Sequence, residues 1–309
     1  MGFVHLHCHT QYSLLDGAIR IDDLVRATVE FSQEAVAITD HGVMYGAVEF
    51  YDKAIKAGIK PIIGSEVYVA PTDMECREAI PGMPRHYHLI LLARNNEGYA
   101  NLMKLTSLAH TRGFYYKPRI DRRALAEYGK GLIGLSACLQ GEIPFWLLRG
   151  DEAKAAEALD FYRKALGGAF YLEIQHNGLP DQDMVNPLIV DLARRSGTAV
   201  VATNDCHYLK PGDAKAHEVL LCIQTQNTIH DKGRMTFESD QLYLKGPDAI
   251  ISGVTNVLFA FPPLLLALSL TSVMDRNWFT VAVAIAIVYI PIFIRVARGP
   301  VLSLRNIEY

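Results

Sequence analysis

The chain has 309 residues, of which 50% are hydrophobic and 20% charged, and this length suits one large domain or two smaller ones. The formal net charge of -3 excludes a protein that coats nucleic acid through bulk positive charge, although it leaves room for a local basic groove. The five cysteines lack the paired spacing of a disulfide framework, and the N-terminus lacks the basic-then-apolar pattern of a signal peptide. We therefore expect residues 1–246 to lie in a reducing cytoplasm.

Short apolar segments rich in Val and Ile alternate with amphipathic stretches as far as Gln224. The predicted strands cover residues 35–39, 60–69, 87–93, 131–135, 169–174 and 198–202. The predicted helices cover residues 22–33, 46–57, 96–109, 152–166, 183–195 and 213–224. This alternation is typical of an α/β protein with a parallel sheet, and at this length it favours a closed or nearly closed barrel.

Side chains able to bind metal gather near the N-terminus and where several predicted strands end. His7 and His9 are two residues apart, as are Asp205 and His207, so each pair would project from one face of an extended segment. Catalytic groups of such barrels lie at the C-terminal ends of the strands, so these side chains are expected to meet on one rim. The candidate set is His7, His9, Asp16, His41, Glu66, His88, Cys138, Asp205 and His207.

Mixed imidazole, carboxylate and thiol ligands suit zinc or manganese, and sites with several such ions activate water and stabilise the leaving oxygen of phosphate esters. Each residue taken alone has a simpler explanation. A single His near a strand end is commonly a hydrogen-bonded structural residue, and Cys138 alone would be read as a buried inert thiol. The complete set favours a metal centre.

Several stretches of the chain resemble the polymerase and histidinol phosphatase (PHP) domain at the N-terminus of bacterial DNA polymerase III alpha subunits. They are residues 3–17, 37–42, 61–68, 131–142 and 202–208, and the likeness runs over residues 3–245. Segments 113–119 and 217–224 resemble the polymerase branch rather than the small phosphatases of the superfamily. The resemblance implies a distorted (β/α)7 barrel that holds two or three zinc or manganese ions through the nine residues above. His88 is the least secure of these, because His86 lies on the same strand face.

The resemblance also implies an activity and partners. A metal-dependent 3'-5' exonuclease of the proofreading type, acting on single-stranded DNA and DNA 3' ends, is expected, with other replisome subunits as partners. A phosphatase of small phosphate monoesters is the alternative. His5 and Asp40 either orient ligands through hydrogen bonds or simply satisfy backbone groups. The expected catalytic residues are His7, His9, Asp16, Asp205 and His207.

The stretch that begins at Arg112 interleaves aromatic rings with cations, a pattern that binds single-stranded DNA by stacking on bases and pairing with phosphates. A solvated turn that leads into a helix explains the same pattern. The candidate DNA-binding residues are Arg112, Tyr115, Tyr116, Lys117 and Arg119.

The C-terminal part differs in composition, because no charged residue lies between Asp248 and Asp275 or between Arg276 and Arg295. Residues 250–274 and 277–294 are therefore predicted to form a transmembrane-like hairpin of two helices, attached to the inner membrane with both ends in the cytoplasm. A buried helical hairpin in a soluble protein is the alternative. Residues 250–309 resemble part of a permease subunit of dipeptide or oligopeptide ABC transporters.

The expected organisation is thus a PHP phosphoesterase domain at residues 1–246 and a permease fragment at residues 247–309. The polymerase site of the parent family is not expected in this chain. A natural fusion, a rearranged gene and an assembly artefact fit the sequence equally. A noncatalytic fragment attached to the membrane is a third functional hypothesis.

Overall fold

The computed structural model describes residues 3–250, which fall within one compact unit of the chain. The predicted membrane hairpin and the permease-like segment lie beyond Ile250, outside the described residues. Within residues 3–250, no helix has both the length and the apolar character needed to cross a bilayer.

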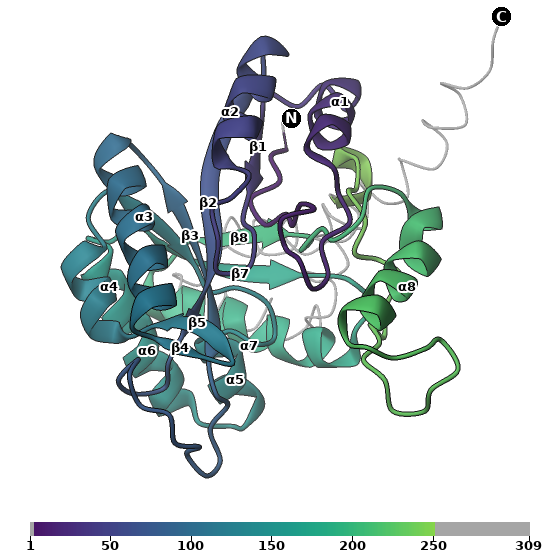
Figure 1. Ribbon diagram of the computed structural model, residues 1–309. Coiled ribbons are helices and arrows are strands. Elements are labelled where there is room, and N and C mark those ends of the chain that lie inside the picture. Colours follow the sequence, from purple (N-terminus) through teal and green to yellow (C-terminus); the bar gives the residue numbers. More distant parts are fainter. Residues whose placement is uncertain (1–2, 251–309) are drawn as a thin grey trace, which may run out of the picture. The chain divides into compact units, whose positions relative to one another are not determined.

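Strands and helices alternate along most of the described part of the chain, except where β3 follows β2, β5 follows β4 and α6 follows α5 (Figure 1). The strands are β1 (Ala35–Ile38), β2 (Lys60–Val69), β3 (Tyr87–Ala93), β4 (Phe114–Tyr115), β5 (Lys117–Ile120), β6 (Leu132–Leu135), β7 (Phe170–Gln175) and β8 (Val200–Thr203). The helices are α1 (Ile21–Glu30), α2 (Ala47–Lys56), α3 (Asn96–Thr111), α4 (Arg122–Tyr128), α5 (Glu142–Leu148), α6 (Glu152–Ala165), α7 (Pro180–Ser196) and α8 (Ala214–Gln224).

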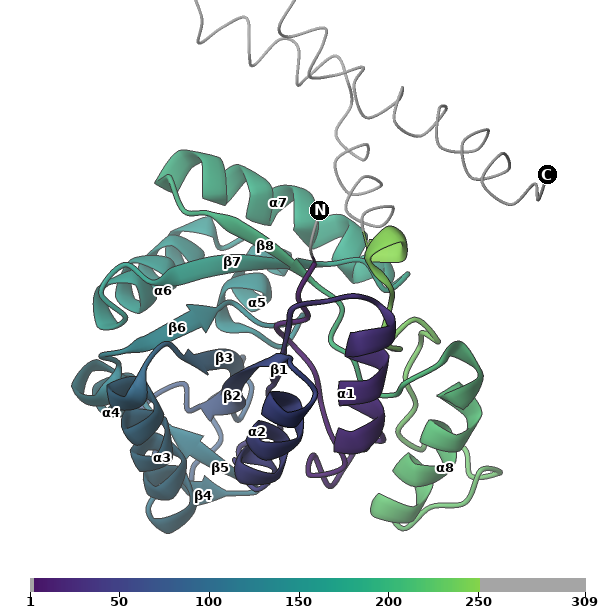
Figure 2. The same ribbon diagram turned by 90° about the horizontal axis from the view of Figure 1, so that it is seen from above.

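The strands form one curved mixed sheet in the order β4-β5-β2-β3-β6-β7-β8, with β1 paired to the first half of β2. The N-terminal segment lies between β1 and the end of β8, which it joins through isolated bridges from His5 to Val36 in β1 and from Cys8 to Cys206 just after β8. Figure 2 shows helices α2, α3, α6 and α7 around the outside of the strands. The architecture is an α/β half-barrel whose open side is spanned by the N-terminal segment.

The predicted α/β class is confirmed, but the predicted parallel sheet is wrong at β3. This strand pairs antiparallel with both β2 and β6. Residues 70–86, between β2 and β3, contain no helix, and a chain that turns back without a crossover helix pairs antiparallel. The sheet is therefore mixed, with β3 as a reversed strand. The fold is a half-barrel where a closed or nearly closed barrel was expected.

The inward face of β3 shows how the core is divided from the polar end. Residues 88, 90 and 92 share one face of the strand because side chains alternate. Ile90 and Leu92 join Ala37 and Leu135 in an apolar cluster, and each buried Leu or Ile side chain contributes about 1.5–3 kcal/mol to folding. His88 lies on the same face at the start of the strand, before these two residues. The interior of the half-barrel is therefore apolar at one end and ionisable at the other.

Helix α7 illustrates how local sequence fixes the outer layer. Pro180 occupies its first turn, where no backbone N–H is needed, and Gly197 ends it in the left-handed conformation with φ of 65°. Val185 and Ile189, four residues apart, are buried on the face that packs against β7. This packing sets the position of the inward-facing side chains of β7.

Candidate metal centre

The nine candidate ligands come from seven places in the chain and meet at one rim of the half-barrel. His7 and His9 lie on the N-terminal segment, and Asp16 lies in the turn that follows. The others lie after β1, late in β2, at the start of β3, after β6 and after β8, in the order His41, Glu66, His88, Cys138, Asp205 and His207.

Glu66 is the most connected of these residues, and its side chain is 1% exposed. Its Oε1 lies 2.8 Å from His88 Nδ1 and 3.6 Å from His7 Nε2. Its Oε2 lies 2.9 Å from His41 Nδ1 and 3.3 Å from His9 Nε2. One carboxylate therefore contacts imidazoles from three separate segments.

Asp205 and Asp16 complete the carboxylate set. Asp205 Oδ1 lies 3.1 Å from His7 Nε2, 3.2 Å from His9 Nε2 and 3.4 Å from His207 Nδ1. Asp16 Oδ2 lies 3.3 Å from His41 Nε2 and 3.8 Å from His207 Nε2. Asp205 thus shares His7 and His9 with Glu66, and Asp16 shares His41 with Glu66. The two aspartates share His207.

Three groups of side chains have ligand atoms within 4.8 Å of one another among the described residues. Cys138 belongs to none of them, although its Sγ lies 3.8 Å from His88 Nδ1. The groups are His7, His9 and Glu66; His41, Glu66 and His88; and His9, His41 and His207.

This donor set fits a bound cation. The Nε2 atoms of His7 and His9 are 3.1 Å apart and both face Asp205 Oδ1, so a proton or a cation must lie among them. Asp16 Oδ1 is buried and has no hydrogen-bond partner within the described residues. Converging imidazole nitrogens and carboxylate oxygens are the ligands that zinc and manganese take in proteins.

The electrostatics also favour cation binding. Burial raises the pKa of Glu66, but His88, His41 and His7 outweigh it and hold that pKa well below the ordinary value. Burial, together with His41 and His207, lowers the pKa of His9 to about 3. An ionised carboxylate and a neutral imidazole are the protonation states that bind metal. Burial lowers the pKa of His7 and His41, but the neighbouring carboxylates outweigh it and raise both well above the ordinary value, so a metal ion would displace a proton from each.

His7 is held by a residue that the sequence analysis missed. Its Nδ1 donates to Glu173 Oε1 over 2.8 Å. The same oxygen accepts from Gln175 Nε2 at 2.9 Å and from Thr203 Oγ1. Glu173 lies in β7 between the buried residues Leu172 and Ile174, and a charged residue inside an apolar strand was the signal that could have found it.

His9 is held by a second missed residue, Ser13. The Nδ1 of His9 donates to Ser13 Oγ over 3.0 Å, and Ser13 Oγ donates to Asp40 Oδ1 over 2.9 Å. Asp40 also accepts from Thr10 N at 2.6 Å. The carboxylate of Asp40 therefore reaches His9 through Ser13, and its backbone carbonyl oxygen accepts from Glu66 N at 3.2 Å.

His5 makes no such connection. Its Nε2 donates to the carbonyl oxygen of Lys245 over 2.8 Å, and its Nδ1 lies 3.5 Å from Cys206 Sγ. It thereby ties the N-terminal segment to the end of the domain. The geometry favours the structural alternative for this residue.

The predicted DNA-binding residues divide into two groups. Arg119 is 3% exposed, and its guanidinium donates to the carbonyl oxygens of Met74 at 2.9 Å and Cys76 at 2.7 Å, with further contacts to Gly113 and Arg85. The predicted DNA contact is wrong for Arg119, because its donors are taken up by the backbone.

The other members of that stretch remain at the surface. Arg112 pairs with Glu75 at 2.6 Å, and Tyr116 is 62% exposed beneath the guanidinium of Arg85. Tyr115 lies under Arg119, with 5.0 Å between guanidinium carbon and ring centroid. Lys117 lies 5.5 Å from the ring centroid of Tyr68.

Tyr68 connects this stretch to the centre. Its ring stacks on that of His41 with centroids 5.8 Å apart. Lys117 and His41 therefore both lie near the ring of Tyr68, which is the link between this stretch and the candidate ligands.

Replacing Arg119 by Met is expected to lower the free energy of unfolding by about 3 kcal/mol or more, because buried carbonyl groups lose a charged donor. Urea denaturation measures this effect. Arg112→Met is the matched control and is expected to be nearly neutral, because that pair is exposed. Equal stability of the two variants would contradict the structural role of Arg119.

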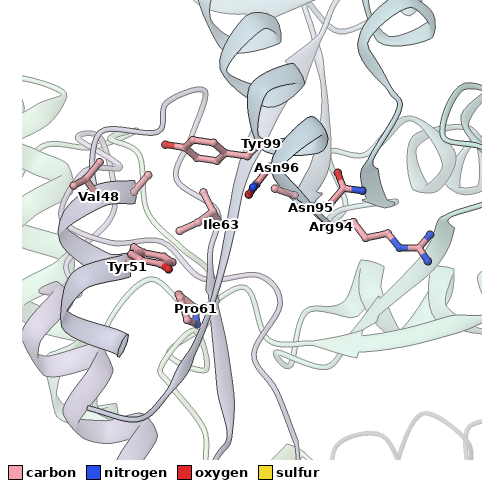
Figure 3. A pocket seen from close by; sticks show the side chains of 10 residues that line it. Val48, Tyr51, Pro61, Ile63, Arg94, Asn95, Asn96 and Tyr99 are labelled. Atoms are coloured by element: carbon pink, nitrogen blue, oxygen red, sulfur yellow. The ribbon is translucent and has the colours of Figure 1, made fainter. Parts of the chain in front are cut away.

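A separate cavity of about 410 Å³ lies between α2 and α3 (Figure 3). Val48 and Tyr51 of α2 face Ile63 of β2 and Tyr99 of α3 across it. None of the candidate ligands lines this cavity, which is bordered by the first residues of β2 and the last residue of β3. It is therefore distinct from the candidate metal centre.

A half-barrel with a buried cluster of histidines and carboxylates on its rim is the arrangement of a metal-binding α/β protein. The sequence pattern of the PHP domain family matches residues 5–177, and the chain belongs to this family. Among curated proteins, the chain is 49% identical over 252 residues to the DNA polymerase III subunit alpha of Thermus aquaticus, covering 80% of this chain and 21% of that protein. It is 46% identical over 249 residues to the Treponema pallidum subunit, again covering 80% and 21%.

The chain spans about a fifth of the length of the curated relatives it matches. Among solved structures, a protein described as a metal-dependent phosphoesterase from Bifidobacterium adolescentis aligns with a TM-score of 0.42 at 13% identity. That alignment covers 81% of this chain and 95% of the other.

Proposed function

We propose that residues 1–246 form a metal-dependent phosphoesterase that removes nucleotides from the 3' end of DNA. The observation that carries this proposal is Glu66, a buried carboxylate in contact with four imidazoles at the rim of the half-barrel. The relatives are subunits of a DNA polymerase, which favours DNA as the substrate and a replication complex as the setting.

Zinc or manganese, when bound, would supply Lewis acidity that activates water and stabilises the departing 3' oxygen. The residues that would hold the ions are the three groups described above, with Asp16, Cys138 and Asp205 beside them. Glu66 belongs to two of these groups and His9 to two. Shared ligands of this kind favour closely spaced ions.

The chain itself prepares the site in two ways. Glu173 and Ser13 hold the Nδ1 atoms of His7 and His9, so that the Nε2 atom of each ring faces the centre. We expect Lys117, whose Nζ lies 5.5 Å from the ring centroid of Tyr68, to pair with a phosphate group of the substrate. These residues orient ligands and substrate without taking part in bond breaking.

The test uses the whole chain and a single-stranded DNA labelled at its 5' end. Manganese or zinc is expected to produce stepwise shortening from the 3' end, and a chelator is expected to stop it. Asp205→Asn is expected to be inactive, because its charge faces three imidazoles. A wild-type protein that binds metal but hydrolyses only small phosphate monoesters would replace this proposal with the phosphatase alternative.

We also propose a domain boundary just after Gly246, close to Ile250, where the compact unit ends. Lys245 anchors this end of the unit, because its Nζ donates to Asn204 Oδ1 over 2.7 Å. The five cysteines are free, which suits a cytoplasmic location for this domain. Membrane attachment through residues 250–294 stays a prediction from the sequence.

A further inference from the structure

A cavity of about 380 Å³ opens directly beside the candidate metal centre. Cys138 and Asp205 line it, so a molecule held in this cavity touches the centre. Its volume falls within the range of pockets that bind small molecules. The segment that contains Met235, Phe237 and Ser239 forms another part of its wall.

The charge of the wall restricts what this cavity binds. Its charged side chains among the described residues are the carboxylates of Asp181, Asp205 and Glu238, with no Lys or Arg. A chain of phosphates would be repelled here. Leu139 and Leu179, together with several amide side chains, instead offer the mixed apolar and hydrogen-bonding surface that suits an uncharged heterocycle.

Phe237 supplies an aromatic face at the boundary between this cavity and the centre. Its ring centroid lies 5.2 Å from that of the candidate ligand His207 and 5.2 Å from that of His217. The ring is only partly buried. An aromatic ring in this setting is a platform on which a base stacks, whatever its sequence.

We infer that this cavity binds the nucleobase of the terminal nucleotide and that Phe237 stacks on it, which leaves the phosphodiester of that nucleotide at the centre. The inference rests on the proposed function and names the part of the substrate that the site recognises. The base enters the anionic cavity, while the phosphate faces the centre.

The first test is binding, which does not depend on turnover. Thymidine 5'-monophosphate and 2-deoxyribose 5-phosphate, which lacks a base, are titrated by calorimetry into the whole chain loaded with manganese, because the phosphate would otherwise face only the carboxylates of the centre. The nucleotide is expected to bind more tightly. Phe237→Ala is expected to weaken nucleotide binding by about tenfold to a hundredfold and leave the sugar phosphate unaffected.

Two further variants separate stacking from folding. Phe237→Leu keeps apolar volume but loses the ring, so it is expected to weaken nucleotide binding with little loss of thermal stability. Tyr51→Ala, in the cavity between α2 and α3, removes an exposed aromatic residue elsewhere and is expected to bind like wild type. Equal affinity of wild type and Phe237→Leu for the nucleotide would overturn the inference.

The second test is hydrolysis of DNA that ends in a normal or in an abasic nucleotide. Phe237→Ala is expected to raise KM for the normal end alone. If wild type cleaves both ends and the variant slows both equally, the cavity assignment is wrong and the nuclease proposal stands. If wild type cleaves neither, the nuclease proposal fails and the binding test still decides the cavity.

Discussion

Glu66→Gln is expected to lower the amount of bound metal and to lower nuclease activity by more than about a hundredfold, because loss of even an indirect ligand contact costs 10–100-fold. The substitution keeps the shape of the side chain but removes the charge that two of the three ligand groups share. The group of His9, His41 and His207 is left, so metal content is expected to fall without reaching zero. Elemental analysis of the purified chain, together with the DNA assay, measures both effects.

Glu142→Gln provides a matched control for a buried carboxylate. Glu142 is 7% exposed in α5 and accepts from Arg122 Nη2 at 2.7 Å and from Tyr162 Oη at 2.6 Å. It contacts none of the candidate ligands, so its replacement is expected to affect stability and leave the metal content of the folded protein unchanged. Equal loss of metal in the two variants would show that unfolding, rather than the ligand change, accounts for the effect of Glu66.

The long elements of the fold could be predicted from the sequence because each carries a clear periodicity. Strands β2 and β3 have the bounds that were expected, and the six expected helices are present within a few residues. The hairpin β4–β5 was missed because its strands have two and four residues, too few to show alternation. Helices α4 and α5 have seven residues each and fall below the length at which a helical pattern can be recognised.

The geometry of the rim was predictable only in part. His41 and Asp205 follow parallel strands, so the rule that places active groups at strand ends locates them. His88 stands at the start of β3 and escapes that rule. It reaches the same rim because β3 runs in the opposite direction, and the sequence pattern alone gives no sign of that reversal.

The residues that support the ligands could not be identified from spacing. Glu173 and its partner His7 are 166 positions apart. Ser13 lies four residues from His9, but the N-terminal segment has no helical or strand periodicity that would bring the two together. Such contacts depend on how the half-barrel closes around them, which only the tertiary structure shows.

Glu173→Gln tests the support of His7 directly. A carboxylate only accepts hydrogen bonds, so it fixes the proton on His7 Nδ1 and leaves Nε2 free to bind a cation. Glu173 Oε1 already accepts from His7 Nδ1, Gln175 Nε2 and Thr203 Oγ1. An amide also carries an N–H₂ group, so in one of its two orientations this group would face these three donors and could accept from none of them. Metal affinity is expected to fall about tenfold to a hundredfold, and competition with a chromophoric chelator measures it.

These measurements distinguish a Glu173 that positions His7 for metal binding from a Glu173 that only stabilises the fold. A positioning role predicts weaker metal binding, with activity restored at saturating metal and a nearly unchanged thermal midpoint of the metal-free chain. Thr203→Val is the matched control, because it removes one donor to Glu173 while leaving the carboxylate in contact with His7. If Glu173→Gln lowered the thermal midpoint but bound metal as wild type does, Glu173 would be a buried structural acid and His7 would hold its orientation without it.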